Sequence, residues 1–70
     1  MRVSQLTKLI LDKDDEIVID DENASLEKMN LYTGAVRGIK RDDPINKLHI
    51  TSICAYNDTI LVLVARKERD

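Results

Sequence analysis

Two runs of apolar and β-branched residues near the C-terminus constrain the fold of this chain more than any other feature. Residues Leu48–Tyr56 and Thr59–Arg66 have the composition of β-strands, and Asn57-Asp58 lies between them. Asn and Asp tolerate the positive φ angles that a two-residue hairpin turn requires. The sequence therefore predicts an antiparallel hairpin. Its cross-strand pairs would be Ile53 with Val62, Cys54 with Leu61, Ser52 with Leu63, and Ala55 with Ile60.

Alternation of side chains makes both faces of this hairpin apolar. One face would hold Ile50, Cys54, Tyr56, Leu61 and Leu63, and the other Ile53, Ala55, Ile60, Val62 and Val64. A single short helix covers only part of one sheet face, so the other face needs a cover of its own. Either residues Asn23–Asn30 or a curled sheet provides it, or a second subunit or a protein partner does. The residues predicted for such an oligomer or partner interface are Ile53, Ile60, Val62 and Val64.

The N-terminal third of the chain predicts a helix and a strand. Apolar residues at helical spacing predict a helix over Ser4–Asp12 with Ser4 as its N-cap, although Thr7 stands where a capping box needs Glu or Gln. The apolar residues on that spacing are Val3, Leu6, Leu9 and Ile10. After a polar turn, Glu16–Asp20 forms a short β-branched strand.

The middle of the chain is less regular. Residues Asp21–Asn30 predict a loop with some helical character, and Leu31–Ile39 predict a second strand. Gly34 and Gly38 within that strand indicate a bulge or a close approach of the backbone, and Arg41–Pro44 has the composition of a turn. We therefore expect an α+β fold. One N-terminal helix would pack on a small, mainly antiparallel sheet of three or four strands, with the C-terminal hairpin at the centre of the sheet.

Length and composition exclude several classes of protein. A chain of 70 residues is expected to form one domain over residues 1–70, too small to enclose a cofactor. The single cysteine, Cys54, allows neither an internal disulfide nor a cysteine-based zinc cage. The longest uncharged apolar stretch, Thr59–Ala65, is too short to cross a bilayer, so a cytoplasmic location is expected.

Acidic residues gather around the first predicted strand. The net charge is only −2, yet seven acids lie between Asp12 and Glu22 with a single Lys among them. They would collect at the two ends of the strand, roughly 16 Å apart. Either they keep the domain soluble, or they imitate a phosphate backbone and bind a basic cleft of another protein. The candidate partner-binding residues are Asp14, Asp15, Asp20, Asp21 and Glu22.

Basic residues offer a different hypothesis. Four lie around the predicted central turn, namely Arg37, Lys40, Arg41 and Lys47, and Arg66, Lys67 and Arg69 follow near the C-terminus. They could neutralise phosphates, but the isoelectric point near 5.3 and the low aromatic content argue against nucleic acid as a partner. Charged strand ends that discourage edge pairing are the simpler explanation.

Sites for chemistry are not expected, so the protein is predicted to be no enzyme and to hold no metal and no cofactor. The acids after Asp12 begin like a calcium loop, but Ile17 stands where the sharp-turn glycine belongs. His49 and Cys54 would lie roughly 16 Å apart on opposite faces of one strand, which excludes a catalytic dyad within the chain. Cys54 is interpreted as a small hydrophobic residue among apolar neighbours, and His49 as a surface or edge residue.

Both ends of the chain resemble small proteins that bacteriophages and other mobile elements of bacteria encode. The residues that carry this resemblance are Val3, Leu6, Ile10, Asp14, Glu16 and the run Ile17–Asp21 at the start, with Ile50–Ile53 and Asn57–Leu61 near the end. The proline that often precedes the first strand of such proteins is absent here. The resemblance implies a non-enzymatic protein-binding module that acts in the cytoplasm of a bacterial host cell and inhibits a host defence protein, as anti-CRISPR proteins do. A nucleic-acid-binding accessory protein and a structural homo-oligomer are the alternatives.

Overall fold

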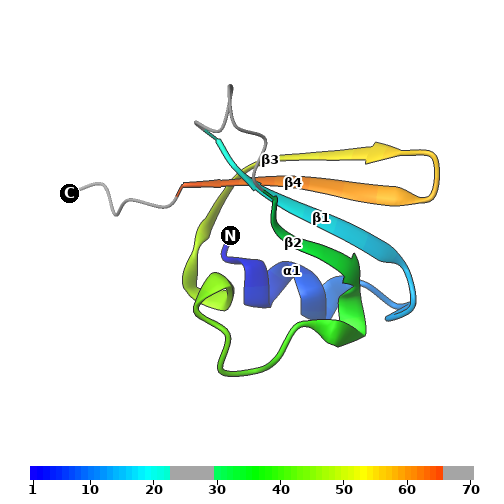
Figure 1. Cartoon of the computed structure of the whole chain (residues 1–70), viewed down its shortest axis with the longest axis horizontal. Coiled ribbons are helices and arrows are strands. Elements are labelled where there is room, and N and C mark those ends of the chain that lie inside the picture. Colours follow the sequence, from blue (N-terminus) through cyan, green and yellow to red (C-terminus); the bar gives the residue numbers. More distant parts are fainter. Residues whose placement is uncertain (23–29, 66–70) are drawn as a thin grey trace.

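The computed structural model of the chain describes residues 1–22 and 30–65, and it has an α+β fold (Figure 1). One N-terminal helix packs on a four-stranded, mostly antiparallel sheet, as the sequence predicts, and the sheet also contains one parallel pair. The elements are α1 (Val3–Leu9), β1 (Glu16–Asp21), β2 (Asn30–Ala35), the 3-10 turns η1 (Val36–Gly38) and η2 (Pro44–Lys47), β3 (His49–Tyr56) and β4 (Thr59–Ala65). None of the helices in these residues is long and apolar enough to cross a membrane.

The strand order β2-β1-β4-β3 corrects the predicted place of the hairpin in the sheet. The β3–β4 hairpin does not occupy the centre, because β4 pairs in parallel with β1 and leaves β3 at the edge. The remaining pairs, β1–β2 and β3–β4, are antiparallel. The two central strands, β1 and β4, therefore carry most of the core.

The register of the hairpin is confirmed at all four predicted pairs. Asn57 has a φ angle of 54°, the left-handed conformation that its two-residue turn requires. The sequence did not predict the register shift at Thr51, between Ile50 and Ser52. Because of this extra residue, Ile50 does not lie on the predicted face with Cys54 and Leu63. It lies on the opposite face, pairs with Val64 and packs against the core.

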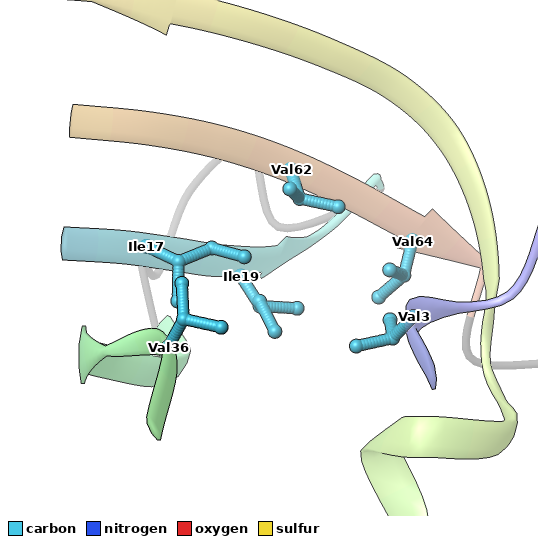
Figure 2. Close-up of a cluster of buried hydrophobic side chains, with 6 residues drawn as sticks. All are labelled: Val3, Ile17, Ile19, Val36, Val62 and Val64. Atoms are coloured by element: carbon cyan, nitrogen blue, oxygen red, sulfur yellow. The ribbon is translucent and has the colours of Figure 1, made fainter. Parts of the chain in front are cut away.

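Six buried apolar side chains form the core between the sheet and α1 (Figure 2). They are Val3 from α1, Ile17 and Ile19 from β1, Val36 from η1, and Val62 and Val64 from β4. The face of the hairpin that packs toward α1 is thus the one that carries Val62 and Val64. This corrects their assignment to a partner interface, because neither side chain has any exposed surface in the folded chain.

The helix α1 begins one residue earlier than predicted and ends at Leu9 rather than Asp12. Its N-cap is Arg2, whose backbone N–H donates to Oε1 of Gln5 at 2.7 Å, so Gln5 occupies the capping position assigned to Thr7. Because the backbone is already extended at Ile10, that residue packs on the core while the last helical residue, Leu9, is 65% exposed.

Strand β2 ends at Ala35, four residues before the predicted end, because Val36–Gly38 folds into η1. The Tyr32 hydroxyl donates to the Ala35 carbonyl at 2.7 Å. A Cβ atom on Gly38 would overlap that hydroxyl, and one on Gly34 would lie 3.0 Å from it. The close approach predicted from the glycines is confirmed, with a tyrosine side chain as the approaching group.

Two predictions fall outside the described residues. The loop with helical character lies mostly within residues 23–29, which also include most of the segment considered as a second cover for the sheet. The basic residues Arg66, Lys67 and Arg69 lie beyond Ala65.

Candidate functional site

A groove with a volume of about 790 Å³ lies between α1 and the connection from η1 to η2. Four of the residues that line it are cationic and none is acidic. The cations are Lys8, Lys13, Arg37 and Arg41, accompanied by Ser4, Thr7, Asn46, Val36 and Ile39. We call this site the basic groove. It gathers positive charge in a chain whose net charge is −2.

Backbone hydrogen bonds between the turn after α1 and η1 build the first wall of the basic groove. An aspartate turn orders residues 12–15, since Oδ1 of Asp12 accepts the N–H of Asp14 at 2.9 Å. The N–H of Arg37 then donates to the Lys13 carbonyl, and that of Val36 to the Asp15 carbonyl, both at 2.9 Å. These bonds place Lys13 beside Arg37, although 24 positions separate them in the sequence.

A second turn, residues 40–46, builds the other wall. The amide of Asn46 donates to the carbonyls of Lys40 at 2.7 Å and Arg41 at 3.1 Å. Oδ1 of Asp43 accepts the N–H of Ile45 at 3.0 Å and so caps η2. Because these side chains hold the backbone on both sides of Arg41, its position at the groove is determined by the turn.

Two of the four cations have partners of their own. Nε of Arg37 lies 2.7 Å from Oδ1 of Asp14, an ion pair whose side chains are 64% and 70% exposed. Nζ of Lys13 donates to the Thr7 carbonyl near the C-terminus of α1, where the helix dipole favours a cation. Within residues 1–22 and 30–65, Lys8 and Arg41 form no ion pair. These two charges are therefore available to an anion, and Arg37 is shared with Asp14.

The acidic residues lie at the two ends of β1, as predicted, but they differ in their surroundings. Asp14 pairs with Arg37 next to the basic groove but is not one of the residues that line it, and Asp15 is half-buried beside it. At the other end Asp20, Asp21 and Glu22 are all half-buried, and the N–H of Glu22 donates to the Val64 carbonyl at 2.8 Å. They form two separate acidic surfaces rather than one.

One carboxylate in the second acidic surface is partly enclosed. Oδ1 of Asp20 is buried and has no hydrogen-bond partner in the part of the chain that the structure describes. Asp20 pairs with Leu63 of β4, so its side chain lies on the face of the sheet opposite α1.

This opposite face, which we call the outer face, carries Val18 of β1, Leu61 and Leu63 of β4, and Cys54 of β3. Val18, Leu61 and Leu63 are half-buried, whereas Cys54 is exposed. Cys54 thus lies across from Leu61 on the predicted face, but its side chain is exposed. His49 is exposed, as expected, and the bulge at Thr51 brings it to the same face as Cys54 rather than to the opposite one.

Only part of the basic groove could be recognised in the sequence. Arg37 and Arg41 were candidates for phosphate neutralisation, and the structure brings them together. Lys40 and Lys47 were candidates too, but they are outside the lining. Lys8 and Lys13 were missed, because no local pattern connects the end of α1 with residues 37–41.

Comparison with models of protein families, with curated proteins and with solved structures found no significant match. In the described ranges, no three side chains of His, Cys, Asp or Glu gather as a metal site would require.

Proposed function

We propose that this chain is a non-enzymatic binding module that holds the phosphate backbone of a nucleic acid in the basic groove. One observation carries the proposal: Lys8, Lys13, Arg37 and Arg41 line a single groove that contains no carboxylate. Clustered Lys and Arg side chains are the usual means by which proteins neutralise phosphates. This local concentration matters more than the acidic isoelectric point of the whole chain, because salt screens distant charges.

The other residues of the groove suit the same ligand. Phosphate oxygens only accept hydrogen bonds, and Ser4, Thr7 and Asn46 supply hydroxyl and amide donors beside the cations. Arginine adds a planar fork that binds two oxygens of one phosphate. A carboxylate-rich peptide offers the same charge, so it is the competing ligand that the experiment must include.

The expected mode of binding is weak and independent of base sequence. The chain has only two aromatic residues, and one of them, Tyr32, uses its hydroxyl to bond Ala35, so base stacking contributes little. The helix α1 is seven residues long, or about 10 Å, which limits the groove to a few phosphates. Dissociation constants of about 1–100 µM at physiological salt are typical of such sequence-independent contacts.

Fluorescence anisotropy with a labelled single-stranded oligonucleotide of about 12 nucleotides tests the proposal. Arg41→Gln should weaken binding about three- to tenfold, because it removes one groove cation without an ion-pair partner in the described residues. Lys47→Gln removes the same charge outside the groove and should change binding less than about twofold. Equal effects of both variants, or tighter binding of a polyglutamate peptide than of the oligonucleotide, would overturn the proposal.

The phage resemblance predicts a protein that occupies a surface of a host defence protein. This is a separate proposal, and it is compatible with a module that binds nucleic acid. It concerns the acidic surfaces at the two ends of β1 rather than the groove, and the acidic substitutions described below test it.

A further inference from the structure

The edge strand β3 leaves part of its backbone without a partner in the described residues. The start of β3 and the residue before it are covered, because the N–H of Val3 donates to the Leu48 carbonyl at 3.0 Å and the N–H of Ile50 to the Met1 carbonyl at 2.8 Å. Beyond the bulge at Thr51, residues 52–55 are all exposed, and no backbone bond reaches their outer side within residues 1–22 and 30–65.

The hairpin geometry identifies which backbone groups point outward. In a hairpin with a two-residue turn, the flanking pair Tyr56–Thr59 exchanges both hydrogen bonds, and hydrogen-bonded pairs then alternate with non-hydrogen-bonded pairs. Counting from Tyr56, the next hydrogen-bonded pair is Cys54–Leu61. Ala55 and Ile53, on either side of Cys54, belong to non-hydrogen-bonded pairs. The N–H and C=O groups of Ala55 and Ile53 therefore point away from β4. We call these four groups the free edge.

The free edge lacks the features that usually prevent one strand from pairing with another. No Lys, Arg, Asp, Glu or Pro occurs between His49 and Tyr56. The side chain of Ile53 is 48% exposed at this edge, and that of Ala55 is exposed as well. The protection provided by residues 1–3 and by the bulge stops before Ser52. An uncharged, extended edge of this kind is complementary to a second copy of itself.

We propose that two copies of this chain pair through their free edges, antiparallel, about a two-fold axis at Cys54. In this register Ile53 of each copy lies opposite Ala55 of the other, so all four groups of each free edge form hydrogen bonds. With the axis at Ile53, Ala55 would have to pair with Thr51, which lies in the bulge. With the axis at Ala55, Ile53 would have to pair with Asn57, which lies in the turn. The result is a continuous sheet of eight strands. The proposal is independent of the basic groove.

This register makes a geometric prediction for Cys54. The two Cys54 residues face each other in a non-hydrogen-bonded pair, where Cα atoms lie about 4.5 Å apart, within the range that a disulfide spans. Mild oxidation with copper-phenanthroline should therefore convert most of the protein into a covalent dimer. The matched control carries Cys54→Ser together with Ser52→Cys. Its cysteines would lie about 13 Å apart, four positions along the strands, and should not cross-link.

Light scattering of the reduced protein supplies an independent readout. At about 100 µM the mass should be twice 8.0 kDa. Ala55→Lys adds a charge to the free edge and should raise the dissociation constant at least about tenfold, whereas Leu11→Lys adds the same charge at a residue that is 98% exposed and should not. A monomer at 100 µM would overturn the proposal. So would a dimer in which the control variant cross-links and the native sequence does not.

Discussion

Replacing Asp14 with Asn should strengthen binding in the basic groove while slightly lowering stability. The Asp14 carboxylate lies 2.7 Å from Nε of Arg37 and competes with any phosphate for that guanidinium. Both side chains are mostly exposed, so the lost ion pair should cost only about 0.2–1 kcal/mol of folding free energy. In water, two charges about 4 Å apart interact by about 1 kcal/mol, which corresponds to about fivefold in affinity.

Two measurements separate these effects. Fluorescence anisotropy should show about three- to fivefold tighter binding of the oligonucleotide, and thermal unfolding followed by circular dichroism should show a melting temperature lower by less than about 8 °C. Glu16→Gln is the matched control, because it removes one negative charge from an exposed residue at the start of β1, two positions from Asp14, that forms no ion pair with a groove cation in the described residues. If Asp14→Asn binds no more tightly than this control, Asp14 does not compete with phosphate for Arg37.

Substitutions in the core, in the turn at Arg41 and in the second acidic surface should each have a distinct effect. Val62→Ala should lower the free energy of unfolding by about 2–3 kcal/mol in chemical denaturation, because it removes two methyl groups from a fully buried site. Asn46→Ala should weaken oligonucleotide binding and lower the free energy of unfolding by about 1 kcal/mol, because the turn that positions Arg41 loses both side-chain hydrogen bonds. Unchanged binding would show that the position of Arg41 does not depend on this turn. Neutralising the second acidic surface should change oligonucleotide binding less than about twofold in 0.1 M salt, since the length of β1, which separates this surface from the groove, is about twice the Debye length. Loss of a host-protein interaction in a pull-down with the same variant would support the phosphate-imitation hypothesis. The substitutions are Asp20→Asn, Asp21→Asn and Glu22→Gln.

The parts of the fold that local sequence determines were predictable. The register of β3 and β4 follows from a two-residue turn and the alternation of apolar residues, both of which are visible within about 20 residues of sequence. The bulge at Thr51 has no such signal. It reverses the face of Ile50, and it determines where the cover from residues 1–3 ends.

The helix boundaries and the groove depend on contacts between distant segments. Arg2 is a poor N-cap by its side chain, but Gln5 and the bridge to residues 48–50 fix the start of α1 at Val3. Similarly, the bonds from η1 to residues 13 and 15 bring separate cations together. The assignment of the hairpin faces could not be decided from the sequence, because both faces are apolar and only packing distinguishes them.

The salt dependence of oligonucleotide binding tests the central claim about the basic groove most directly. If its four cations neutralise phosphates of a single strand, the logarithm of the association constant should fall against the logarithm of salt concentration with a slope of about −3. Replacing both Arg37 and Arg41 with Gln should change that slope to about −1.5, because each phosphate contact on a single strand contributes about −0.7 to the slope. A slope near zero for the native protein, or a slope that the double variant leaves unchanged, would contradict the account.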